Sequence, residues 1–112
     1  KSVSSYHLCK TTMPYAIITK DKPGTASLRE AHQSAHKKYL DENKHLLLAA
    51  GAMLDDAGTA AHGGVLLVDM ESYEEAEAFV HNDPFWEAAL FENVTITRWR
   101  KAFFNSERLV DL

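Results

Sequence analysis

The chain lacks the features that mark several common classes of protein. It has one cysteine in 112 residues, so no disulfide can form within the chain and no cysteine-based metal motif is present. No apolar run approaches the roughly 20 residues needed to cross a bilayer. The sequence also has no nucleophile elbow and no glycine-rich phosphate loop. These absences argue against serine-hydrolase and nucleotide-binding chemistry.

Charged side chains show no large excess of one sign. The 12 lysines and arginines face 16 aspartates and glutamates, which gives a net charge of −4, and the acidic residues are scattered. This distribution does not favour nucleic acid as the main partner. Hydrophobic residues make up 46% of the chain, enough for the core of one domain. We expect a soluble cytoplasmic domain whose partner is a small molecule, not nucleic acid or a membrane.

The first twelve residues differ from the rest of the chain. They are polar and show no periodicity, and Met13 follows them. They also lack the apolar stretch of a secretory signal. We interpret residues 1–12 as a tag-like or weakly ordered arm, with a short targeting segment as the alternative. Residues 13–112 then form a single domain.

Four segments are rich in strand-forming residues. They are bounded by turn residues, and the segment 55–64 is rich in small residues and is expected to be a loop. The predicted strands cover residues 14–20, 45–54, 65–70 and 93–103.

Two helices are predicted at residues 27–43 and 72–81. Each begins with a capping-box pattern, in which Ser27 or Ser72 would accept from the backbone three residues on. A shorter helix is expected after Asp83, with Pro84 in its first turn, where its missing N–H costs nothing. The resulting order, βαββαβ, is typical of a ferredoxin-like α+β fold with an antiparallel sheet.

The pattern of the strands also predicts a homodimer. Two helices can cover only one face of the sheet, yet residues 45–54 and 65–70 are apolar at nearly every position. One chain has no further helix or sheet with which to cover the second face. A second copy packed sheet against sheet would cover it.

Four side chains are candidates for chemistry. His36 continues the apolar stripe of the first helix, and Asp83 could point into the cleft beneath that helix and polarise the imidazole for proton transfer. The alternative for Asp83 is a plain helix cap. Arg29 lies about two turns before His36 and could bind an anionic group or form a surface ion pair. Asp21 follows the first strand and is favoured as a loop residue.

A metal site is the other interpretation of His36. His32 lies four residues earlier on the same side of the helix, and such a pair can bind a metal. However, no third ligand and no glutamate within the pair are apparent. We therefore expect no metal and no cofactor.

From residue 13 to residue 103 the sequence resembles the YciI-like (YCII-related) proteins. The resemblance rests on Arg29 and His36 in the first helix, on Gly51, and on three blocks. The blocks are PYAIITKDKPG, GGVLLVDMES and NDPFWEAALFENVTITRWRKAF. Any one would be weak evidence, but their order is specific.

The resemblance implies a dimeric α+β barrel with an active site in each subunit, built around a His–Asp pair. Carried onto this chain, the pair is His36 and Asp83, with Asp21 and Arg29 as supporting substrate-binding candidates. This chain has Gln33 where many relatives have arginine. The family is linked to dehydrochlorination of chloroaromatic compounds, and the wider superfamily includes muconolactone isomerases and cofactor-free monooxygenases.

Two functions follow as hypotheses. The first is a cofactor-independent lyase or isomerase that uses His36 and Asp83 on a small cyclic or aromatic oxygenated substrate, in a homodimer or a higher oligomer. The second is a non-catalytic module that binds a metabolite or supports a partner protein, with His36 in a structural role.

Overall fold

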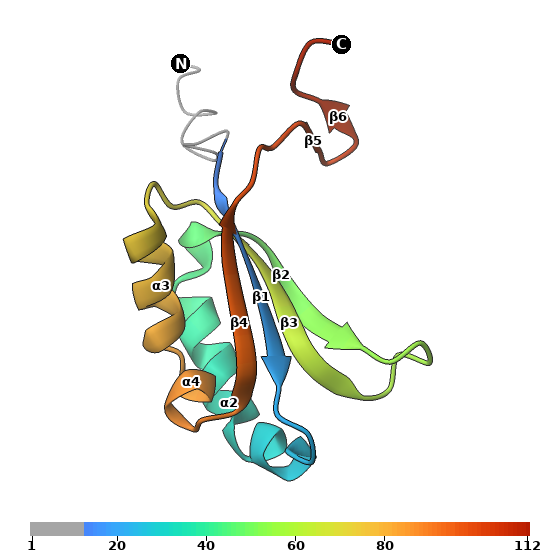
Figure 1. Ribbon diagram of the computed structural model, residues 1–112, viewed down its shortest axis with the longest axis vertical. Helices are drawn as coiled ribbons and strands as arrows, with labels where there is room; N and C mark the ends of the chain where they lie inside the picture. Colours follow the sequence, from blue (N-terminus) through green and yellow to red (C-terminus); the bar gives the residue numbers. More distant parts are fainter. Residues whose placement is uncertain (1–12) are drawn as a thin grey trace.

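The computed structural model describes residues 13–112, so the arm expected at residues 1–12 lies outside the described part (Figure 1). None of the helices in residues 13–112 is long and apolar enough to span a membrane. The elements along the chain are β1 (Tyr15–Asp21), α2 (Ala26–Glu42), the 3-10 turn η1 (Lys44–Leu46), β2 (Leu47–Leu54), β3 (Ala61–Val68), α3 (Tyr73–His81), α4 (Pro84–Glu87), β4 (Phe91–Arg98), β5 (Phe103–Phe104) and β6 (Glu107–Arg108).

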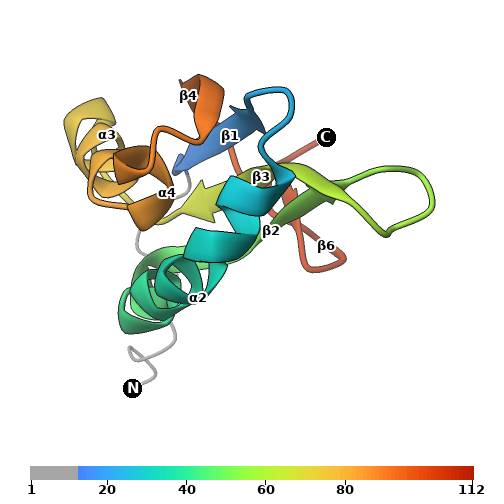
Figure 2. The same cartoon turned by 90° about the horizontal axis from the view of Figure 1, so that it is seen from below.

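The four long strands form one antiparallel sheet in the order β2-β3-β1-β4. The helices α2, α3 and α4 lie on one face of this sheet, as the view along its edge shows (Figure 2). The predicted α+β class and the predicted order of strands and helices are therefore confirmed. This arrangement brings α2 and α4 into contact on the same face of the sheet.

The core lies between the sheet and the helices. Ile17 of β1 and Val68 of β3 are 0% exposed, and both belong to the same cluster as Ala76, Phe79 and Val80 of α3. Side chains alternate across a strand, so the residues on either side of Ile17 point away from this core. The core therefore takes only one face of the sheet.

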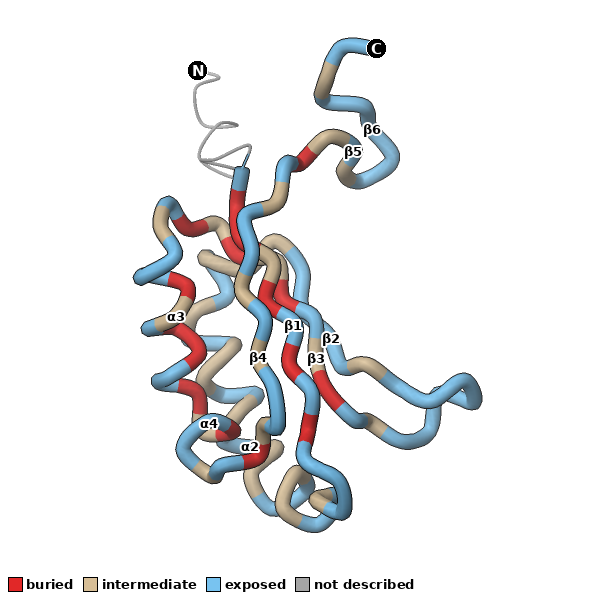
Figure 3. Tube along the Cα trace, viewed as in Figure 1, coloured by how far each residue is buried: buried red, intermediate tan, exposed pale blue. Residues whose placement is uncertain are grey.

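The opposite face of the sheet is open in the single chain, and several of its residues are exposed (Figure 3). Ile18 of β1 and Val65 of β3 are directly paired there, and they are 40% and 38% exposed. This agrees with the patterning that predicted a dimer. The homodimer itself stays a prediction.

Helix α2 begins earlier than the sequence indicated. The N-cap is Thr25, and its backbone oxygen accepts from Arg29 N at 2.9 Å, so Ser27 already lies inside the helix. The capping box predicted at Ser27 is wrong. Gly24, with φ of 74°, makes the turn that allows the early start. The second capping box is confirmed, since Ser72 Oγ accepts from Glu75 N at 3.1 Å.

Strand β3 also begins earlier than predicted, at Ala61 instead of residue 65. The Asp55 carboxylate accepts from Thr59 N at 2.7 Å and from Ala60 N at 2.9 Å, which closes the turn after β2 within a few residues. These hydrogen bonds lower the pKa of Asp55. The expected loop at 55–64 is consequently shorter, and Gly63 and Gly64 are strand residues.

The last predicted strand, 93–103, is in fact two separate pieces. Strand β4 ends at Arg98, and Phe103–Phe104 pairs with Glu107–Arg108 in a small hairpin. Asn105 and Ser106 have φ of 54° and 66°, as a tight two-residue hairpin turn requires. Figure 1 shows this hairpin beyond the end of the main sheet.

Candidate active site

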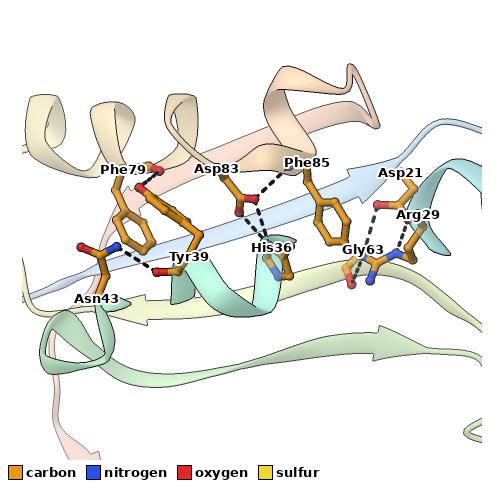
Figure 4. A network of polar contacts seen from close by, with 9 residues as sticks. All are labelled: Asp21, Arg29, His36, Tyr39, Asn43, Gly63, Phe79, Asp83 and Phe85. Carbon is orange, nitrogen blue, oxygen red and sulfur yellow. Dashed lines mark hydrogen bonds and ion pairs between the residues drawn. The ribbon is translucent and has the colours of Figure 1, made fainter. Parts of the chain in front are cut away.

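His36 and Asp83 come together although 47 residues separate them in the sequence. His36 lies in the middle of α2, and its Nδ1 is 2.9 Å from each oxygen of the Asp83 carboxylate (Figure 4). The two side chains are 17% and 7% exposed. In this partly buried setting a charged pair is screened by solvent less than on the surface.

Asp83 is also the N-cap of α4. Its Oδ1 accepts from Phe85 N at 2.9 Å, and Pro84 occupies the first turn as predicted. The cap and the partner of His36 were alternatives in the sequence interpretation. The structure shows that one carboxylate does both.

The pairing determines which nitrogen of His36 carries the proton. An ionised carboxylate can only accept, so Nδ1 donates its hydrogen to Asp83. Within residues 13–112 no hydrogen bond is made by Nε2, and His36 lines a cavity. When the ring is neutral, Nε2 is the acceptor nitrogen, and His36 lines a space in which a ligand could lie.

Phe85 fixes the plane of the imidazole. Its ring is stacked on that of His36, with centroids 4.0 Å apart and an interplanar angle of 14°. Phe85 is only 1% exposed, so its ring has little freedom to move away. In Figure 4 it lies between His36 and Arg29, whose guanidinium carbon is 4.8 Å from the centroid.

Arg29 and Asp21 form a second partly buried pair. Arg29 Nε donates to Asp21 Oδ2 at 2.7 Å, and a terminal nitrogen donates to the Gly63 carbonyl at 3.2 Å. The two side chains are 13% and 7% exposed, so Arg29 forms an ion pair that is partly buried and not on the surface. Asp21 is the last residue of β1 and not a loop residue. The pair holds Arg29 against Phe85.

Tyr39 follows His36 by one turn of α2. Its hydroxyl donates to the Phe79 carbonyl at 2.7 Å. Burial, with a smaller contribution from the Asp83 carboxylate, raises the pKa of Tyr39 to about 12. Tyr39 therefore remains protonated near neutral pH and ties α2 to α3.

A cavity of about 180 Å³ lies between α2 and the sheet. Its β2 and β3 wall consists largely of small residues, which leaves room for a flat group against the strands. On the α2 side His36 is joined by other polar side chains, and aromatic and aliphatic residues close the rest. The small-residue wall comprises Ala50, Gly51, Ala52, Gly63 and Gly64, and the polar group comprises Arg29, Gln33, His36 and Lys37.

Three of the four predicted site residues line this cavity directly. His36, Asp83 and Arg29 line the cavity, whereas Asp21 reaches it only through Arg29. The alternative of a metal site at His32 and His36 gains no support, because among the described residues no group of three His, Cys, Asp or Glu side chains could hold a metal ion.

Sequence reasoning missed the positions of Phe85 and Lys37. Nothing in the sequence singles out Phe85, because its stacking on His36 depends on a contact between distant segments. Lys37 could have been found from its spacing, since Arg29, Gln33 and Lys37 recur every four residues on one side of the helix.

A family model for the YCII-related domain matches residues 13–100. The chain belongs to this family. Protein YciI from Escherichia coli O6:H1 is 32% identical over 100 residues, which cover 81% of this chain and 100% of the relative. An uncharacterized protein from Haemophilus influenzae is 26% identical over 98 residues, with coverage of 81% and 100%.

A solved structure with the same fold belongs to a dehydrochlorinase. It is the 5-chloro-2-hydroxyhydroquinone dehydrochlorinase TftG from Burkholderia phenoliruptrix AC1100, in complex with 2,5-dihydroxybenzoquinone. The TM-score is 0.73 and the sequence identity is 35%, over 79% of this chain and 94% of TftG. The YCII-related fold thus supports lyase chemistry in at least one similar protein.

Proposed function

We propose that this protein is a cofactor-independent lyase that removes hydrogen chloride from a small oxygenated ring, with His36 as the general base. The observation that carries the proposal is the orientation of the imidazole. Nδ1 is held by Asp83, the ring is held by Phe85, and His36 lines a largely apolar cavity. The likeness to TftG supports the same class of reaction.

The proposed step needs only a positioned base. Nε2 takes a proton from a ring hydroxyl or ring carbon, and the electrons of that bond move into the ring system. The C–Cl bond breaks, and chloride leaves with its electron pair. The net loss is HCl, with no change in the overall oxidation level and no redox partner. Asp83 would stabilise the imidazolium that forms after proton transfer.

An isomerase would use the same groups. In that reaction the imidazolium returns the proton to a different ring atom, and no group leaves. The arrangement of His36 and Asp83 serves both reactions, so the choice between them depends on whether the substrate carries a leaving group.

Arg29 and Asp21 belong to the proposal in different ways. Arg29 lines the cavity and can contact the substrate, while Asp21 would act indirectly by holding the guanidinium in place. Because Asp21 pairs with Arg29, its carboxylate is held by the guanidinium and would not repel an oxygenated ligand in the cavity.

We also propose that the protein works as a homodimer. The open face of the sheet around Ile18 and Val65 is apolar and could be covered by the same face of a second copy. Sedimentation at several concentrations would measure the assembly. The cytoplasmic location stays a prediction from the sequence.

The test is to incubate the protein with 5-chloro-2-hydroxyhydroquinone and to measure the released chloride by ion chromatography. We expect His36→Asn to lower turnover by about 10²- to 10⁴-fold, the usual contribution of a general base. His32→Asn is the matched control, because His32 lies one turn away on α2 and is not among the cavity-lining residues.

Two results would count against the proposal. Unchanged turnover in His36→Asn would remove His36 from the chemistry. Absence of turnover in the unaltered protein, together with saturable binding of the compound, would instead support the alternative of a non-catalytic metabolite-binding module.

A further inference from the structure

Helix α2 presents one row of polar side chains to the cavity. Arg29, Gln33 and Lys37 follow one another at intervals of four residues and therefore lie along the same side of the helix. All three line the cavity together with His36. Most of the remaining lining is aliphatic or aromatic, so these few groups determine which polar atoms a ligand can place there.

The charge of Arg29 is already used within the protein. Its guanidinium donates to Asp21 and to the Gly63 carbonyl, so a ligand would meet a cation that has a carboxylate at 2.7 Å. The Asp83 carboxylate is likewise occupied by His36 and Phe85. Two of the charges at the cavity are thus largely balanced.

Lys37 differs from these groups. Within residues 13–112 no carboxylate lies within ion-pair distance of its ammonium group. An unpaired lysine on a helix is ordinarily just a solvated surface residue, and Lys37 and its neighbour Lys38 are both exposed. Lys37 borders the cavity and Lys38 is not among its lining residues, which makes Lys37 the lining cation that is free to meet a ligand.

We propose, building on the proton-transfer role proposed for His36, that Lys37 makes the site selective for rings that carry an ionised oxygen, a phenolate or an enolate. The ammonium group would donate to that oxygen while the ring occupies the apolar part of the cavity. Gln33, one turn earlier, can donate or accept and so accommodates a second, neutral oxygen without selecting for charge.

This selectivity suits the proposed elimination. Electron density from an ionised oxygen conjugated with the ring helps to expel a leaving group. Lys37 follows His36 directly in the sequence, so the anion and the reacting proton would be held by neighbouring residues of one helix. The substrate class is therefore a small, planar, hydroxylated ring that is already an anion when it binds.

The test uses a pair of probes with the same ring. Pentafluorophenolate is ionised at neutral pH and pentafluoroanisole is not, and fluorine NMR reports the binding of both. We expect the protein to bind the phenolate more tightly than the anisole. Lys37→Met should weaken the phenolate about tenfold, as for the loss of one charge-assisted contact, and leave the anisole unchanged.

Two further variants make the result specific. Lys37→Arg keeps the positive charge and should retain most of the preference for the phenolate. Lys38→Met removes an equal charge from the next residue of α2 and should leave both affinities unchanged. Raising the salt concentration should reduce the difference between the probes in the unaltered protein but not in Lys37→Met.

The proposal is overturned if Lys37→Met and Lys38→Met behave alike, if Lys37→Met weakens both probes equally, or if the phenolate does not bind. The role of His36 is judged separately, since binding of the probes involves no proton transfer. An intact preference for the phenolate with unchanged turnover in His36→Asn would leave the Lys37 proposal standing and remove the proposed reaction.

Discussion

Replacing Asp83 by asparagine and by alanine separates the two roles of this side chain. Asparagine caps a helix about as well as aspartate, and its amide oxygen can accept from both Phe85 N and His36 Nδ1. Asp83→Asn therefore removes the negative charge but keeps the hydrogen bonds. Asp83→Ala removes both.

The stability of the two variants should differ clearly. For Asp83→Ala the lost cap costs about 1 kcal/mol. The donor left unpaired at His36, beside a residue that is 5% exposed, adds about 1–3 kcal/mol. We expect the free energy of unfolding to fall by about 2–4 kcal/mol in total. Asp83→Asn should lose less than about 1 kcal/mol. Urea unfolding followed by circular dichroism would measure both.

The activity of Asp83→Asn should fall even though the protein remains stable. A hydrogen bond to a charged group is worth about 1.5–3 kcal/mol and a neutral one about 1 kcal/mol. The carboxylate would therefore stabilise the imidazolium of His36 by about 1–2 kcal/mol more than the amide, which corresponds to roughly a five- to thirtyfold loss of turnover. Nitrogen NMR should show that Nδ1 of His36 still carries the proton.

The capping role and the electrostatic role of Asp83 can be refuted separately. Equal stabilities of the asparagine and alanine variants would refute the capping role. Full turnover in a folded Asp83→Asn would refute the electrostatic role. A shift of the proton to Nε2 in Asp83→Asn would show that the charge, and not the acceptor oxygen, fixes the tautomer.

Two other predictions concern the framework of the site. Gly63→Ala would place a Cβ 2.1 Å from the Thr19 carbonyl oxygen and should lower the free energy of unfolding, measured in urea, by about 1–3 kcal/mol. Gly64→Ala is the control, because its Cβ would have its nearest atom at 3.4 Å and should lower the same quantity by less than about 1 kcal/mol. Equal losses in the two variants would contradict the close approach of the strands at Gly63. Because the pKa of Tyr39 is raised to about 12 by burial and by Asp83, folding stability should be intact below about pH 10 and should fall as the pH rises from there through 12. Tyr39→Phe should lose about 1 kcal/mol with the hydrogen bond to Phe79 and should flatten this part of the pH profile of stability; an unchanged slope would exclude Tyr39 as its source.

Much of the fold could be predicted because its signals are local. The capping pattern at Ser72 and the proline after Asp83 each act within one turn of helix, and the structure has both. Ser27 shows the limit of such signals, since the same pattern lies inside α2 once the turn at Gly24 allows the helix to begin at Ala26. The sequence alone does not show which of two possible helix starts, Thr25 or Ser27, the chain will use.

The site depends on contacts that no local pattern encodes. The pair of Arg29 and Asp21 forms because the end of β1 passes beneath the start of α2, next to the carbonyl of Gly63 on β3. The spacing of Arg29 and His36 placed them on one side of a helix, but it could not show that the guanidinium already has a carboxylate partner. The residues alone left the pairing of Asp83 with His36 as one alternative beside a plain helix cap, and the resemblance to known proteins favoured the pairing.

The turn that contains Asp83, Pro84 and Phe85 explains how a helix cap and a contact with His36 can coincide. Pro84 sets the backbone for the first turn of α4, which brings Phe85 N to the Asp83 carboxylate at 2.9 Å. The same residue, Phe85, then stacks its ring on the imidazole that the carboxylate accepts from. Three consecutive residues thus fix both the orientation of the carboxylate and the plane of His36. A cap needs only the hydrogen bond from Phe85 N, so the contact of Asp83 with His36 and the stacking of Phe85 on His36 are additional to it.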